Sequence, residues 1–361
     1  ATLAFVAVYG VLHCLSSIAP SFLHRVLLAL VIVGSIGTIQ VLGFAMCISY
    51  VISLFLVLLA LQAPPLKPSR LIPLVVILSF STNSSFIAAP LFLLRAYTTR
   101  ERGMLLCGIL TFAPLPIILA LASASASPHS LAALQNTPAK ILATIDAGVF
   151  YLFAAPMGGG LLANLDKPWR FCLLSIFIAS FLIFLLKSGR RSRLLSLGLA
   201  GAAVLYIAAH GFGRAYSITG SLTNFRLTPD RFAFVLIPCT VMAWTALLFD
   251  QPRLKGRVRD SFFLIIVSAQ ILTTVISRGA TMPTFSSRSW ERFALELYAA
   301  RRNPPGLHIA EVPVNPMRRG QSWGLIRCDN TAADYVRCSD VRGNWEGIVY
   351  EIPRLAAPHD N

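Results

Sequence analysis

The chain has 361 residues, of which 56% are hydrophobic and only 13% are charged, and its mean hydropathy is +0.69. A water-soluble protein of this length would carry far more charge, so the composition argues against a soluble domain and indicates a lipid bilayer. The formal net charge is +16. This charge is spread over short loops and forms no basic stripe with interleaved aromatic residues, which argues against nucleic acid as a partner.

Long apolar blocks fill residues 1–280, which hold 21 of the 31 Lys and Arg residues but only 6 of the 15 Asp and Glu residues. A bilayer core about 30 Å thick needs roughly 20 apolar residues per helix, so we expect an all-α polytopic membrane bundle of about 8–10 membrane helices, some of them broken or re-entrant. The first block begins at Ala1 and is short for a span, so we expect it to be the end of a helix that begins upstream. The apolar blocks are residues 1–15, 26–61, 71–94, 103–122, 171–186, 194–212, 232–249 and 261–276.

The basic residues predict an orientation for the bundle. Five of its loops share 14 Lys and Arg residues, whereas the loops of the opposite side hold 7 over much longer stretches. Cytoplasmic loops are the ones enriched in Lys and Arg. The block at 26–61 fits two spans that turn near residues 37–40, which keeps both of its ends on the cytoplasmic side. The five predicted cytoplasmic loops are residues 16–25, 62–70, 95–102, 187–193 and 250–260.

Two segments must be irregular for this alternation to hold. Residues 71–94 have a polar centre, STNSS at 81–85, between two basic flanks, which predicts a hairpin of two half-helices whose tip is covered by protein or water. Residues 122–169 are expected outside, with a helix at 131–142 on the membrane surface. Residues 150–162 would then dip inward, interrupted by Pro156 and the glycines that follow it. The alternative is that both segments are ordinary spans, which would invert some loops.

The composition changes after Ile276. Residues 281–361 hold 10 basic and 9 acidic residues and no block long enough to span a membrane. We expect a small α+β tail outside the cytoplasm, with a helix at 289–300 and strands at 307–314, 323–328, 335–338 and 347–352. An oxidising compartment would permit a disulfide between Cys328 and Cys338 across the intervening turn, and two free thiols are the alternative.

Familiar catalytic motifs are absent from the sequence, which has no P-loop, HExxH, GxSxG or dinucleotide fingerprint and no Cys/His cluster that predicts a metal site. The candidate substrate-binding residues are Asp146, His210, Arg214 and Arg231, all expected near the outer face. Two arginines that meet across one loop can hold a phosphate or carboxylate bidentately. The alternatives are that Arg231 pairs with Asp230, or that both arginines anchor helix ends among lipid headgroups.

Asp146 and His210 are weaker candidates. A carboxylate flanked by apolar residues is costly in a membrane unless it is paired or faces water. Asp146 is therefore either a base or cation partner, or an interfacial residue that reaches water. His210 either assists the arginines or is a structural histidine at a helix end.

Three segments between Leu71 and Phe249 carry short motifs: HGFGRAYSITGSLTNFRLTPDRFAF, LSFSTNSSFIAAPLFLLRA and FYLFAAPMGGGL. Together they resemble bacterial polytopic glycosyltransferases of the GT-C type. In HGFGRAYSITGSLTNFRLTPDRFAF, Arg214 matches the arginine of a "GR" element, and Arg231 with Phe232 matches "RY", with Phe in place of Tyr. LSFSTNSSFIAAPLFLLRA is similar to a broken-helix element of that family. FYLFAAPMGGGL is similar to its "fLG-pl" outer loop, with two alanines in place of Leu-Gly.

The resemblance implies transfer of a sugar from a polyprenyl-phosphate donor to an acceptor outside the membrane. Arg214 and Arg231 would contact the donor phosphate and stabilise charge on the leaving group. In that family the catalytic acid lies in the first large outer loop, but this chain has no acidic residue before Glu101, so no catalytic base is assigned.

The other functions considered are a transporter or flippase of a polar or lipid-linked substrate and a non-catalytic membrane assembly protein. The expected partners are membrane lipids and a polyprenyl-phosphate-linked sugar. No cofactor is expected, and the use of a divalent metal is left open. The expected location is the bacterial inner (plasma) membrane, as a multi-pass integral protein with its tail outside.

Overall fold

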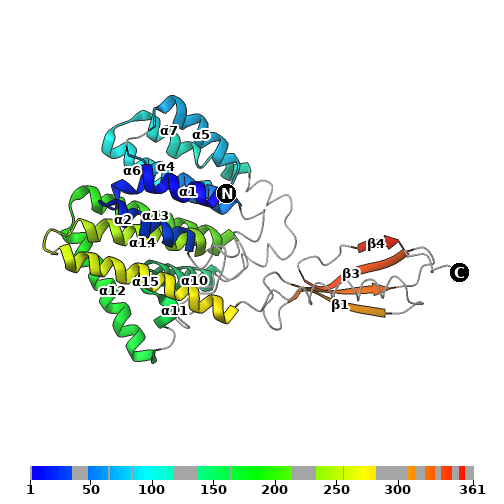
Figure 1. Cartoon of the computed structure of the whole chain (residues 1–361). Coiled ribbons are helices and arrows are strands. Elements are labelled where there is room, and N and C mark those ends of the chain that lie inside the picture. The colour runs from blue at the N-terminus through cyan, green and yellow to red at the C-terminus, as the bar shows by residue number, and fades with distance from the viewer. Residues whose placement is uncertain are drawn as a thin grey trace. The chain divides into compact units, whose positions relative to one another are not determined.

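The computed structural model describes most of the chain as helices and four strands (Figure 1). The chain divides into two compact units, Ala1–Ser277 and Arg278–Asn361. The described residues are 2–34, 48–63, 66–82, 84–117, 137–162, 165–213, 233–254, 256–281, 307–313, 322–329, 335–343 and 349–353.

The first unit is an all-α bundle. In chain order its described helices are α1 (Thr2–Tyr9), the π-helical turn η1 (Gly10–Cys14), the 3₁₀ turn η2 (Leu15–Ser17), α2 (Phe22–Gly34), α4 (Ile48–Leu61), α5 (Pro68–Phe80), η4 (Ser85–Ala88), α6 (Ala89–Thr99), α7 (Arg102–Leu110), α10 (Thr137–Val149), η5 (Phe150–Ala154), η6 (Ala155–Met157), α11 (Gly159–Leu162), α12 (Lys167–Lys187), α13 (Arg190–Gly213), α14 (Ala233–Phe249) and α15 (Gly256–Thr281). The turn predicted at 37–40 lies outside the described residues.

Three of the described helices are long and apolar enough to cross a membrane: Lys167–Lys187, Arg190–Ala209 and Gly256–Val275. This finding supports the prediction of a membrane protein. The larger number of about 8–10 membrane helices stays a prediction, because the other apolar helices have 10–17 residues and, at 1.5 Å per residue, each is shorter than a bilayer core of about 30 Å.

Helix α14 forms the centre of the bundle, and α12 and α15 face outward. Every residue of α14 from Ala233 to Leu248 is buried. By contrast, Leu186 of α12 is 73% exposed and Ile265 of α15 is 60% exposed. Exposed branched aliphatic side chains on helices of span length are what a lipid-facing surface requires.

The break predicted in the STNSS segment is present, and its polar groups are satisfied by neighbouring helices. Helix α5 ends at Phe80, and the chain resumes in η4 and α6. The Thr82 hydroxyl lies 2.8 Å from Ser53 Oγ and donates to the Ser49 carbonyl at 3.0 Å, and Ser85 Oγ donates to the Thr111 carbonyl at 2.8 Å. Buried polar groups are tolerated when they are hydrogen-bonded, which explains how a helix can be interrupted inside an apolar bundle.

A second break follows α10, where the predicted irregular segment also occurs. The chain passes through η5 and η6, and Gly158 has φ 80° and ψ 51°, a left-handed conformation that favours glycine. Gln270 Nε2 of α15 donates to the carbonyls of Ala155 at 2.5 Å and Pro156 at 2.8 Å, and Trp244 Nε1 donates to the Leu152 carbonyl at 2.9 Å. The neighbouring helices therefore supply donors to carbonyls of the irregular segment, in addition to the Gly158 N–H that donates to the Ala155 carbonyl at 3.1 Å.

The boundaries predicted for the helix before this break were wrong. Helix α10 continues to Val149 instead of ending at residue 142, and it packs against α13. Residues 141–157 form one apolar helical stretch, so no polar residue ends the helix at the predicted place.

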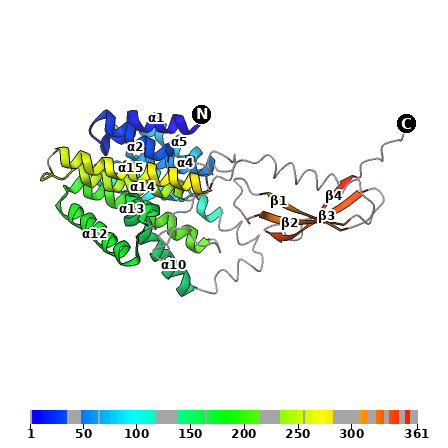
Figure 2. The same ribbon diagram turned by 60° about the horizontal axis from the view of Figure 1, so that its bottom comes forward.

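The second unit contains a four-stranded antiparallel sheet in the order β1-β2-β3-β4 (Figure 2). The strands are β1 (Leu307–Pro313), β2 (Ser322–Asp329), β3 (Tyr335–Gly343) and β4 (Val349–Pro353), in the order and places that the sequence predicts. β3 is longer than expected, and the register shifts between Leu325 and Ile326. The helix predicted at 289–300 lies outside the described residues.

Candidate functional site

The five loops predicted on one side of the membrane contact one another at one end of the bundle. The backbone N of Gly189 donates to Asp250 Oδ2 at 2.5 Å, which joins loop 187–193 to loop 250–260. Arg190 Nη2 lies 3.5 Å from Tyr97 Oη, and this contact joins loop 187–193 to loop 95–102. Arg95 Nη1 donates to the Ala60 carbonyl at 2.9 Å, at the end of α4 before loop 62–70.

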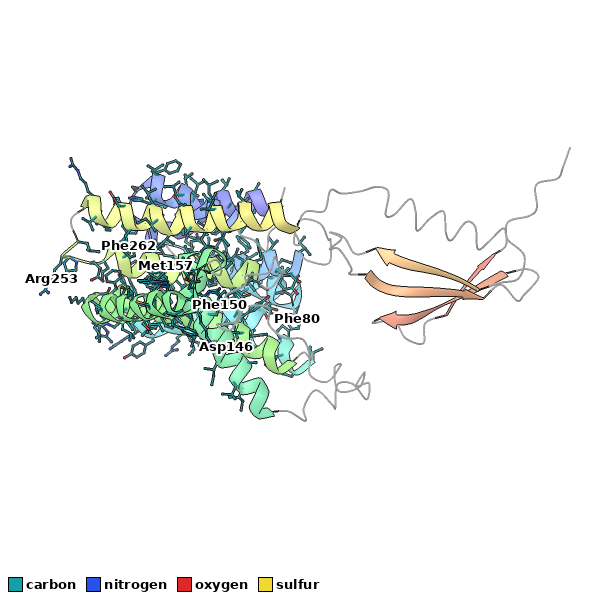
Figure 3. All side chains as sticks on the ribbon, turned by 90° about the horizontal axis from the view of Figure 1, so that it is seen from below. Phe80, Asp146, Phe150, Met157, Arg253 and Phe262 are labelled. Atoms are coloured by element: carbon teal, nitrogen blue, oxygen red, sulfur yellow. The ribbon has the colours of Figure 1, made fainter. Side chains whose placement is uncertain are left out.

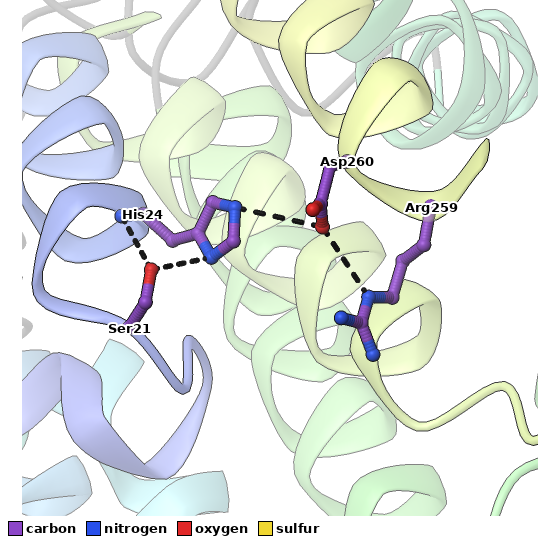
Figure 4. A network of polar contacts seen from close by, with 4 residues as sticks. All are labelled: Ser21, His24, Arg259 and Asp260. Carbon is purple, nitrogen blue, oxygen red and sulfur yellow. Dashed lines mark hydrogen bonds and ion pairs between the residues drawn. The ribbon is translucent and has the colours of Figure 1, made fainter. Parts of the chain in front are cut away.

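The remaining loop, 16–25, is tied to the same end by a small polar network (Figure 4). His24 Nε2 lies 3.6 Å from Asp260 Oδ1 at the start of α15, and His24 Nδ1 lies 2.7 Å from Ser21 Oγ. Arg259 Nε also approaches Asp260 Oδ1, at 3.5 Å. The clustering of all five loops is what the charge distribution predicts for loops on the same side of a membrane, although it does not identify that side.

A pocket of about 860 Å³ opens among these loops. Four arginines line it: Arg95 and Arg100 from the end of α6, and Arg190 and Arg191 from the start of α13. The remaining lining residues are Ser17, Ala60, Leu61, Gln62, Ala63, Leu91, Leu94, Ala96, Tyr97, Thr98, Thr99, Leu194 and Leu195.

Helix α6 packs closely against α13 at Gly198, whereas Gly201 has room for a side-chain Cβ atom. A Cβ atom added at Gly198 would meet Leu91 Cδ2 at 2.9 Å and Leu94 Cδ2 at 3.1 Å, and one at Gly201 would meet Pro90 Cβ at 3.8 Å. Small residues at helix interfaces let the backbones approach each other. The leucines of α6 that contact Gly198 are themselves pocket residues, so this contact positions one wall of the site.

The electrostatics of the pocket are dominated by positive charge. Burial lowers the pKa of the Arg95 guanidinium below its ordinary value, while Glu101 raises it in part and Arg191 lowers it. Among the residues that the structure describes, no carboxylate lies within 4.0 Å of any of the four guanidinium groups. An arrangement of this kind favours an anion, and no group of three or more metal-ligating side chains occurs in the same described part of the chain.

The structure describes only one of the four predicted substrate-binding side chains. Asp146 lies half-buried on α10, and Figure 3 shows it away from the end of the bundle marked by Arg253. His210 belongs to the last turns of α13, but its side chain is outside the described part. Arg214 and Arg231 lie outside the described residues, as does the loop between them.

The helices that flank this loop are nevertheless described. Asp250 at the end of α14 bonds to Gly189 at the start of α13, and α13 and α14 pack along each other (Figures 1 and 2). The two helices therefore run antiparallel. Gly213 and Ala233, the residues at which the loop leaves α13 and enters α14, consequently lie at the opposite end of the helix pair from the arginine pocket.

No protein-family model, curated protein or solved structure matches this chain. The four arginines of the pocket were assigned to loops on one side by the sequence, but their convergence was missed. It depends on the packing of α6 against α13, a tertiary contact that is close at Gly198.

Proposed function

We propose that this integral membrane protein transfers a sugar from a lipid-linked polyprenyl-phosphate donor to an acceptor on the extracytoplasmic side. In this proposal Arg214 and Arg231 hold the donor phosphate, and the five basic loops lie in the cytoplasm of a bacterium whose inner membrane contains the bundle. Asp146 and His210 are secondary candidates for contact with the substrate.

The observation that carries this proposal is the antiparallel arrangement of α13 and α14. Arg214 follows Gly213 directly, and Arg231 precedes Ala233 by two residues, so both arginines are tethered to helix termini at the same end of one packed pair. Two guanidinium groups can bind phosphate bidentately and stabilise the charge that develops as the sugar departs.

A second function, transport of a lipid-linked or polar substrate, is supported by the two interrupted helices. Transporters use broken helices near the centre of the membrane to form substrate sites. Both breaks in this bundle have polar backbone or side-chain groups that are satisfied by neighbouring helices. A break with a purely structural role needs the same hydrogen bonds, so these bonds are weak support for transport. The positions of Arg214 and Arg231 at neighbouring helix ends are stronger support for sugar transfer.

The test is to replace Arg214 and Arg231 singly with glutamine, with Arg226→Gln as a matched control that removes one positive charge from the same loop. Membranes from each strain are analysed by mass spectrometry for lipid-linked sugars and for the extracytoplasmic glycan. We expect Arg214→Gln and Arg231→Gln to lower transfer by about 100-fold or more, with accumulation of the lipid-linked sugar, and Arg226→Gln to resemble the wild type. Wild-type transfer in both test variants would refute the phosphate-binding role. Accumulation confined to the cytoplasmic leaflet would favour transport instead.

A further inference from the structure

The arginine pocket at the loop-rich end of the bundle has no role in the proposed sugar transfer. Arg190 begins α13 and Gly213 ends it, so the pocket and the Arg214 region lie at opposite ends of one 24-residue helix. We propose that this pocket is a separate binding site for a phosphate group, carried by an anionic lipid of the adjacent membrane leaflet.

The arginines are available to a ligand because the described structure uses little of their bonding capacity. Each guanidinium has five N–H donors. Arg95 donates one hydrogen bond to the Ala60 carbonyl, and Arg190 makes one long contact with the Tyr97 hydroxyl. Arg193, by contrast, is used structurally, since its Nη2 donates to the carbonyls of Leu186 and Ser188, and it does not line the pocket.

The clustering of arginines increases the attraction for an anion. Helix α13 begins with Arg190 and Arg191 and has no acidic residue in its first turn. The Asp250 carboxylate accepts the backbone N–H of Gly189 just before the helix, but it makes no ion pair within 4.0 Å with either arginine. Like charges are thereby brought together with no described carboxylate in contact, and a phosphate would relieve the repulsion. Glu101 is close enough to affect Arg95 but makes no ion pair with it within 4.0 Å.

The other wall of the pocket is apolar, which favours an amphiphilic ligand over a small soluble anion. Leucines 61, 91, 94, 194 and 195 line it beside Ala60 and Ala96. The exposed Tyr97 also lines the pocket and has a hydroxyl that can donate a hydrogen bond, whereas the hydroxyls of Thr98 and Thr99 already donate to the Arg95 carbonyl. A phospholipid would place its phosphate among the arginines and the first part of its acyl chains against the leucines. The volume of about 860 Å³ is of the size found for small-molecule sites.

The experiment compares two double variants that each remove two exposed positive charges from the same end of the bundle. Arg190→Gln/Arg191→Gln alters the pocket, and Arg253→Gln/Arg257→Gln alters a neighbouring loop whose arginines do not line it. Full-length protein in neutral detergent is titrated with dioctanoylphosphatidylglycerol or dioctanoylphosphatidylcholine, and occupancy is measured by native mass spectrometry. Arg95 is left intact, because it bonds to Ala60 and its loss could disturb folding.

We expect phosphatidylglycerol to bind the wild type and the Arg253/Arg257 variant equally, and the Arg190/Arg191 variant at least about tenfold more weakly, the effect of losing roughly 1.4 kcal/mol of binding free energy. Phosphatidylcholine, which has no net charge, should bind weakly to all three. Equal binding by all three proteins, an equal loss in both double variants, or no preference for phosphatidylglycerol would overturn the proposal. A competition with inorganic phosphate distinguishes the source of the phosphate group. Displacement of the lipid only when inorganic phosphate is in large excess supports a lipid headgroup as the ligand. Displacement at a phosphate concentration similar to that of the lipid shows that free phosphate is the ligand and overturns the lipid assignment.

Discussion

Asp250 Oδ2 accepts a hydrogen bond of 2.5 Å from the backbone N of Gly189, and this contact fixes the end of α14 to the start of α13. Gln251 reinforces the junction, since its Nε2 donates to the Ser188 hydroxyl at 2.8 Å and to the Phe184 carbonyl at 3.0 Å. These polar contacts fix the turn before α13 against the end of α14, and the packing of α13 along α14 gives the antiparallel pair its length of contact.

Replacement of Asp250 by alanine should lower the free energy of unfolding by about 1 kcal/mol, because the amide of Gly189 loses its acceptor in a partly exposed position. The measurement is thermal unfolding in detergent. Asp166→Ala is the control, since Asp166 precedes α12, is exposed and makes no capping hydrogen bond. An equal fall in the melting temperature of both variants would show that the contact has no specific stabilising effect.

The second break should depend on Gln270. Gln270→Met keeps a similar volume but removes the side-chain donor to the carbonyls of Ala155 and Pro156, of which only that of Ala155 keeps a described backbone donor, Gly158 N, so we expect a loss of about 1–3 kcal/mol. Thr274→Val on the same helix is the control, because the Thr274 hydroxyl bonds only to the Gln270 carbonyl within α15. Unfolding followed by tryptophan fluorescence reports both. Stability of Gln270→Met equal to that of the control would mean that another donor replaces the amide.

Two glycines near this break should respond oppositely to alanine. Gly158 has φ 80°, which costs a residue with a Cβ atom about 1–2 kcal/mol, so Gly158→Ala should destabilise the bundle. Gly148 lies in α10 with nothing within 4 Å of an added Cβ, so Gly148→Ala should stabilise it by up to about 1 kcal/mol. The difference in melting temperature between the two variants is the readout, and a difference of the opposite sign would contradict the described backbone.

The thiols of the tail provide a test of its location. The register of β2 and β3 places Cys328 directly opposite Cys338, and paired positions on antiparallel strands lie within the Cα separations that disulfides use. We expect the two cysteines to resist alkylation in denatured, unreduced protein and to react after reduction, as measured by peptide mass spectrometry. Alkylation of both without reduction would show free thiols and would argue against an oxidising compartment.

Much of the fold followed from simple patterns in the sequence. The apolar blocks predicted the helices, the STNSS segment predicted the first break, and alternation with turn residues predicted the four strands. The predicted end of α10 was wrong, however, because residues 141–157 are apolar throughout and hydropathy marks no boundary within them. The irregular turns in this stretch are stabilised by Gln270 and Trp244 from other helices, contacts that a local sequence pattern does not contain.

The candidate sites were also predicted only in part, since the sequence indicates the side of the membrane but not which side chains meet. Charge counting placed Arg95, Arg190 and Arg191 on one side, yet their convergence in a pocket depends on the close contact of Gly198 with Leu91, a tertiary feature. For Arg214 and Arg231 the pairing of α13 with α14 supports a common end of the bundle. Their role in holding a phosphate is still a prediction from the sequence, because the side chains lie outside the described residues.

The central claim is that the five basic loops and the loop that carries Arg214 and Arg231 lie on opposite sides of the membrane. Single cysteines introduced as Lys187→Cys and Asn224→Cys, in a background without the seven native cysteines, can be tested with a membrane-impermeant maleimide on intact cells. We predict labelling of Asn224→Cys from outside and labelling of Lys187→Cys only after permeabilisation. Labelling of both positions from the same side, or of Lys187→Cys alone in intact cells, would contradict the claim.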